Sequence, residues 1–134
     1  MKNKGFTLVE LLGVITILAM FGLIIIPTID NVITNNKKKL YDVQIRNIKS
    51  GASNFVDEHF FDSSLDIPNG GSIGVRLGKL KELGYVDDNI KNPVSKKLFD
   101  DDMIILINYN NSSFNYIVCD DGVVCGTPLS IYGE

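Results

Sequence analysis

Glu10 is the one ionisable side chain in an otherwise apolar segment near the start of the chain. From Phe6 to Ile26 there is no Lys, Arg or Asp, and at about 1.5 Å per residue a helix of this length crosses a hydrocarbon core of about 30 Å. A carboxylate in a membrane helix costs roughly 2.5 to 3.5 kcal/mol on insertion scales and by default marks a functional position with a partner. The chemistry that Glu10 offers in such a layer is pairing with a cation.

The remaining ionisable side chains do not form a pattern typical of catalysis. The other carboxylates lie mostly in runs within polar stretches: Asp57, Glu58, Asp62, Asp66, Asp87, Asp88 and Asp100 to Asp102. None of these has an apolar context that would raise its pKa for acid or base chemistry. His59 is the sole histidine, and the chain has no nucleophile elbow, glycine-rich phosphate loop or D-x-D-x-D-G calcium loop. The sequence predicts no enzyme, cofactor or metal site.

Two ordinary interpretations of the apolar segment compete with a functional role for Glu10. A cleaved secretory signal has an apolar stretch of roughly 7 to 15 residues and then a small-residue cleavage site. Here the stretch is longer and ends in "IIIPTID". An uncleaved membrane anchor fits the length, but an anchor gives no reason for the carboxylate.

The stretch "KGFTLVELL" resembles the signature of type IV prepilins and pseudopilins. That signature is a short basic leader ending in glycine, then phenylalanine, then a glutamate at the fifth position of the mature chain. In that family a membrane-embedded aspartyl peptidase cuts after the glycine on the cytoplasmic side and N-methylates the new terminal residue. The resemblance therefore implies cleavage between Gly5 and Phe6, with Phe6 as the methylated terminus.

Cleavage would create a cationic partner for Glu10. An α-amino group has a pKa of about 7.7 to 8, so the Phe6 amine would be mostly charged at neutral pH. In a low-dielectric layer, opposite charges attract strongly and neither is stable alone. We expect Glu10 to be unpaired within its own chain and to select the Phe6 of an adjacent subunit. The alternative is pairing with its own Phe6, because residues i and i+4 share a helix face.

Gly22 and Pro27 weaken the same segment as a helix. Glycine costs about 1 kcal/mol relative to alanine in a helix interior, and proline removes a backbone donor and clashes with the preceding turn. Pro27 matches the position of a proline in many pilins, where the resemblance implies that the helix bends or melts as the filament packs. The alternative is that Pro27 only ends the membrane span.

An amphipathic pattern follows Pro27. Apolar residues recur at spacings of three and four: Tyr41, Ile45, Ile48, Ala52, Phe55 and Val56. We predict one helix from about Thr7 to Phe60, apolar on nearly every side in its first half and with one apolar stripe in its second. At this spacing, Tyr41, Phe55 and Phe60 indicate core packing, and a ligand-binding aromatic box is the alternative.

The C-terminal half has the composition of a small head. Turn residues in "DSSLDIPNGGSIG" predict a loop, and leucines at helical spacing over 77–83 predict a short helix that ends at Gly84. The segments "DMIILINYNN" and "SFNYIVCDDGVVC" predict strands. The predicted fold is α+β and type IV pilin-like, with a long N-terminal helix packed on a small antiparallel sheet. Its expected parts are a leader (1–5), a transmembrane or filament-core half (6–27), an amphipathic half (28–61) and a globular head (62–134).

Cys119 and Cys125 are the only cysteines, in a segment that resembles a hairpin. The odd number of residues between them lets their side chains face one another across a ladder, provided that their Cα atoms lie within about 7 Å. For an exported head we predict a disulfide that pins the C-terminal strands, since closing so short a loop gains little chain entropy. A zinc site is the alternative, but it needs four ligands and only His59 could join the two cysteines.

The charge pattern and the resemblance together indicate a class of function. The net charge is −3 over 134 residues, with acids and bases interspersed, so no nucleic-acid surface is predicted. The resemblance implies a pilin that is a single-pass membrane protein with its N-terminus in the cytoplasm, and then a subunit of an extracellular filament for adhesion or motility. Implied partners are further copies of the chain, membrane lipid, prepilin peptidase, an assembly ATPase and a membrane platform protein. The alternatives are a pseudopilin of a secretion or DNA-uptake machine and a monomeric anchored binding domain.

Overall fold

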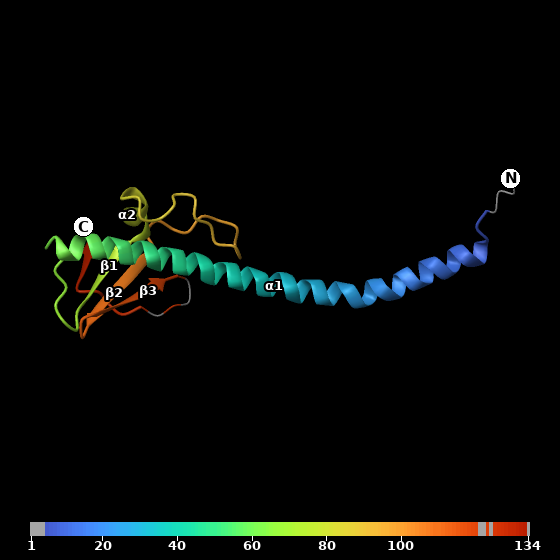
Figure 1. Ribbon diagram of the computed structural model, residues 1–134, viewed down its shortest axis with the longest axis horizontal. Helices are drawn as coiled ribbons and strands as arrows, with labels where there is room; N and C mark the ends of the chain where they lie inside the picture. Colours follow the sequence, from blue (N-terminus) through green and yellow to red (C-terminus); the bar gives the residue numbers. More distant parts are fainter. Residues whose placement is uncertain (1–4, 121–122, 124, 134) are drawn as a thin grey trace. The chain divides into compact units, whose positions relative to one another are not determined.

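The computed structural model describes residues 5–120, 123 and 125–133. The chain divides into two compact units, residues 1–38 and 39–134. A single helix, α1 (Leu8–Phe61), supplies residues to both units (Figure 1). The predicted helix is therefore confirmed with boundaries one residue later at each end.

The first unit consists of the N-terminal part of α1 and the residues before it. Its described large apolar side chains are all exposed, from 90% at Phe6 to 46% at Ile33. They are Phe6, Leu8, Val9, Leu11, Leu12, Val14, Ile15, Ile17, Leu18, Met20, Phe21, Leu23 to Ile26, Ile29, Val32 and Ile33. By length and composition α1 is able to cross a membrane. A helix that is apolar on every side needs lipid or other protein around it.

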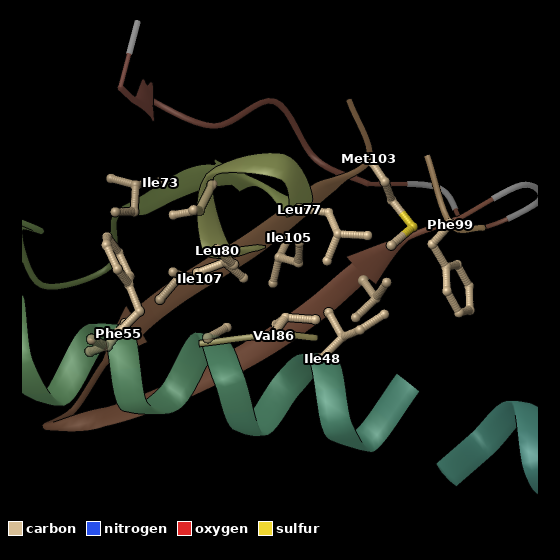
Figure 2. Close-up of a cluster of buried hydrophobic side chains, with 14 of the residues drawn as sticks. Ile48, Phe55, Ile73, Leu77, Leu80, Val86, Phe99, Met103, Ile105 and Ile107 are labelled. Atoms are coloured by element: carbon tan, nitrogen blue, oxygen red, sulfur yellow. The ribbon is translucent and has the colours of Figure 1, made fainter. Parts of the chain in front are cut away.

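In the second unit, the apolar stripe of α1 packs against the head. Ile48, Ala52, Phe55 and Val56 are fully buried, and Tyr41, Ile45 and Phe60 pack at the edge of the same cluster. Figure 2 shows Ile48 and Phe55 projecting from α1 toward side chains of the head, among them Leu80, Val86 and Ile107. The predicted stripe is confirmed, and so is the interpretation of its aromatic residues as core.

The head holds a four-stranded sheet in the order β3-β2-β1-β4. The strands are β1 (Ser72–Arg76), β2 (Ile104–Asn110), β3 (Ser113–Cys119) and β4 (Ser130–Tyr132), and a short helix α2 (Leu77–Glu82) follows β1 directly. β2 is antiparallel to both β1 and β3, as predicted for the head, whereas β4 is parallel to β1. The sheet is therefore mixed rather than purely antiparallel.

Two of these strands were not expected from the sequence. β1 lies in a stretch where turn residues and helical leucine spacing predict a loop followed by a helix, and β4 has only three residues. Both become strands through pairing: Gly74 of β1 lies opposite Leu106 of β2 and beside Ile131 of β4. Tertiary hydrogen bonding therefore overrides local preference in these two short segments.

Cys119 and Cys125 form a disulfide with a Cα–Cα distance of 5.9 Å. The predicted bond is confirmed, and the zinc alternative is removed because both sulfur atoms are used. The predicted hairpin around it is wrong, since β3 ends at Cys119 and Cys125 lies outside any strand. Next to the bond, the Tyr41 hydroxyl of α1 donates a hydrogen bond to the Asp120 carboxylate.

Candidate processing and assembly site

The bond predicted to be cleaved lies just outside α1. Gly5, Phe6 and Thr7 are not helical, and the helix begins at Leu8. Phe6 is almost fully exposed, and a Cβ placed on Gly5 would meet no heavy atom within 4 Å. Neither packing nor a left-handed backbone therefore requires glycine at position 5. If glycine is needed at position 5, the requirement comes from an enzyme that recognises this segment.

Thr7 and Glu10 join the start of α1 in a reciprocal pair of hydrogen bonds. The Thr7 backbone N–H donates to Glu10 Oε2 at 2.9 Å, and the Glu10 backbone N–H donates to Thr7 Oγ1 at 3.2 Å. The first N–H groups of a helix have no partner within it, so this capping box satisfies two donors at once. It also places the carboxylate at the helix N-terminus, where the helix dipole favours negative charge.

Glu10 has a hydrogen-bond partner in its own chain, the neutral backbone N–H of Thr7. Phe6 precedes the helix in the uncleaved chain. Pairing of Glu10 with the amine of its own Phe6 or of a neighbour's Phe6 concerns the cleaved chain, and both stay predictions. The role of Thr7 was not expected from the sequence. The signal was present as T-x-x-E at the start of an apolar run, which is the sequence form of a capping box.

Gly22 and Pro27 do not interrupt the helix in this structure. α1 is continuous through both positions, and a Cβ on Gly22 would meet nothing within 4 Å. The side chain of Pro27 lies outside the described part of the chain. The predicted bending or melting of the helix at Gly22 and Pro27 applies to the packed filament, and it stays a prediction. The leader residues before Gly5 also lie outside the described range.

His59 and Glu58, at the C-terminal end of α1, take part in packing and hydrogen bonding. His59 stacks on Phe55 with ring centroids 4.5 Å apart, and its Nδ1 lies 3.0 Å from the Phe55 carbonyl oxygen. Tyr85 donates a hydrogen bond to Glu58, which raises the pKa of the tyrosine to about 12. Among the described residues, no group of three or more His, Cys, Asp or Glu side chains is placed to hold a metal ion.

The comparison with protein families agrees with this site. Residues 1–26 match the family model described as the prokaryotic N-terminal methylation motif. The chain carries the type IV prepilin motif. The match covers the leader and the apolar segment but not the head, and neither curated proteins nor solved structures give a match. The motif is that of type IV prepilins and pseudopilins, and the α+β fold with its long apolar helix is pilin-like.

Proposed function

We propose that this chain is the structural subunit of a type IV pilus, cleaved by prepilin peptidase between Gly5 and Phe6 and polymerised through the N-terminal part of α1. The observation that carries the proposal is the position of Glu10. Its carboxylate is held at the start of a helix whose large apolar side chains are all exposed in the first unit of the isolated chain. Such a surface must be covered, first by lipid and then by other copies of the chain.

The capping box suggests how the Glu10 carboxylate is accommodated both in the unassembled subunit and in the filament. Cleavage after Gly5 would leave Thr7 and Glu10 intact, so the box persists in the unassembled subunit and satisfies the carboxylate in the membrane. N-methylation of Phe6 leaves an amine that still carries a proton. Transfer of Glu10 from the neutral Thr7 amide to the Phe6 ammonium of a neighbour exchanges a hydrogen bond for an ion pair, which is strong where water is excluded.

The proposal also assigns location and partners. Before assembly the chain would span the cell membrane once with its N-terminus in the cytoplasm. An assembly ATPase and a membrane platform protein would extract it into a filament. The second unit, which contains the head, would form the surface of the filament and support adhesion or motility.

Substitution of Gly5 tests the processing step. Gly5→Leu adds a side chain to open space, so the fold of the chain is unaffected. We expect a full-length, membrane-bound precursor and no filaments, as measured by mass spectrometry of the N-terminus and electron microscopy. Gly13→Ala is the matched control because its Cβ also meets nothing within 4 Å, and it should be cleaved. Wild-type filament levels from Gly5→Leu would contradict the proposal.

Two substitutions of Glu10 separate its charge from its capping role. Glutamine at the third helical position preserves the capping box but cannot form an ion pair, whereas alanine loses both. We expect Glu10→Gln and Glu10→Ala to be cleaved normally and both to incorporate poorly into filaments. Efficient assembly of the glutamine variant alone would show that the cap, not the charge, is what assembly uses.

A further inference from the structure

A polar groove lies where the segment after α2 crosses the C-terminal part of α1. Its volume is about 510 Å³, within the usual range of small-ligand sites. Its polar and aromatic lining is Gln44 and Asn47 from α1 with Tyr85, Asp87, Asn89 and Lys91 from the crossing segment. All of these residues belong to the unit formed by residues 39–134.

The side-chain amides of this groove are available to a ligand. Within the described residues, no side-chain hydrogen bond engages the amides of Gln44, Asn47 or Asn89, or the ammonium of Lys91. Each amide offers two N–H donors and a carbonyl acceptor. Three amides in one hollow match a molecule whose groups both donate and accept, as hydroxyl groups do.

The walls of the groove are fixed by packing. Gly51 of α1 is buried, and a Cβ placed on it would lie 2.5 Å from the Tyr85 carbonyl oxygen and 2.6 Å from Val86 Cγ2. The crossing segment therefore rests directly on the α1 backbone. Tyr85 is also held by an edge contact with Phe55, at a centroid distance of 5.8 Å, and by its hydrogen bond to Glu58. Packing therefore holds the backbone on both sides of the groove, while the Asn47 and Asn89 side chains are exposed.

We propose that this groove binds a neutral saccharide. Hydroxyl groups would pair with the amides of Gln44, Asn47 and Asn89, each of which both donates and accepts hydrogen bonds. An anionic ligand is disfavoured because the carboxylate of Asp87 in the lining, with that of Asp88 next to it in the chain, outweighs the single ammonium of Lys91.

An acyl chain is disfavoured because the apolar lining residues, Val86 and Ile90, are buried. The inference extends the proposed adhesive role of the filament. It is tested on unassembled chains, so its failure is distinguishable from failure of the filament proposal.

The experiment is an NMR titration of the ¹⁵N-labelled full chain, solubilised in a zwitterionic detergent without a sugar headgroup. The probes are the methyl glycosides of glucose, galactose and N-acetylglucosamine, added separately. We expect saturable shifts of the Gln44, Asn47 and Asn89 side-chain amides with at least one probe. Gln44→Ala/Asn47→Ala should raise the Kd by about tenfold or more, because each neutral hydrogen bond contributes modestly.

Both substitutions favour the helix, so the double variant keeps its fold. Asn54→Ala is the matched control because Asn54 is an exposed α1 amide outside the groove, and it should bind like the native chain. The proposal is overturned if none of the three glycosides gives saturable shifts at the groove, or if the double variant binds with native affinity. Saturable shifts with inorganic phosphate but with no glycoside would likewise overturn it.

Discussion

For Gly51→Ala, the structure and helix propensity predict opposite changes in the free energy of unfolding. Alanine in place of glycine in a helix interior stabilises by about 1 kcal/mol. At position 51, however, the new methyl group would lie 2.5 Å from a backbone oxygen and 2.6 Å from Val86 Cγ2. Rotation of a side chain relieves only the second contact, so the α1 backbone and the crossing segment must move apart.

Overpacking of this kind costs about 1 to 3 kcal/mol, and contact with backbone places the cost near the upper value. Subtraction of the propensity gain leaves a net loss of about 2 kcal/mol in the free energy of unfolding. The same movement would widen the groove, so weaker saccharide binding should accompany the loss of stability.

Urea unfolding of the detergent-solubilised full chain measures this change. The chain has five tyrosines and no tryptophan, so near-ultraviolet circular dichroism of tyrosine reports head packing. Ser50→Ala is the matched control, because Ser50 is the adjacent exposed helical position and should gain about 0.5 kcal/mol. If Gly51→Ala were as stable as the native chain or more so, at an unchanged urea dependence, the close approach of α1 and the Tyr85 segment would be refuted.

Two further predictions concern the head. The hydrogen bond to Glu58 raises the pKa of Tyr85 to about 12. Its stabilising effect is therefore present below pH 10, the ordinary tyrosine pKa, and is lost as the pH rises through about 12. Ultraviolet titration should show one tyrosine that ionises late and whose pKa moves toward 10 in Glu58→Ala; an unchanged profile in that variant would argue against the bond. Replacing Cys119 and Cys125 by serine opens a loop with a sequence separation of 6, which by the chain-entropy relation costs about 2 kcal/mol. The free energies of unfolding in urea of the oxidised and reduced native chain should differ by the same amount, and equal values would mean that the bond does not stabilise the head.

The cysteine pair shows where local sequence is sufficient and where it is not. Separation by an odd number of residues, in a segment that the prepilin resemblance implies is exported, predicted the disulfide. The hairpin around it was wrong, because β3 pairs only with β2 and the chain leaves the ladder after Cys119. A bond between near neighbours depends on local distance, whereas strand pairing depends on which distant segment offers free backbone groups.

The β1 segment shows a second limit of sequence patterns. Its residues do alternate, with Ile73 and Val75 on one face and Ser72, Gly74 and Arg76 on the other, but the pattern is only five residues long. Ile73 and Val75 join the core, and a Cβ placed on Gly74 between them would lie 2.9 Å from Ile104 Cγ2. So short an alternation, with a glycine at its centre and turn residues before it, does not by itself predict a strand. The strand could be found only from its pairing with β2 and β4.

The sequence by itself determined the N-terminal segment, the stripe on α1 and the α+β class. An uninterrupted apolar run, the G-F-x-x-x-E spacing and a helical period are local properties, which need no distant contact to be recognised. Only the tertiary structure decided the mixed order of the sheet and the groove beside Gly51, because both depend on which distant segments meet. The partnership of Thr7 with Glu10 is local and its T-x-x-E signal lies in the sequence, but it also depends on the exact residue at which the helix begins, because that residue decides which backbone donors remain to be satisfied.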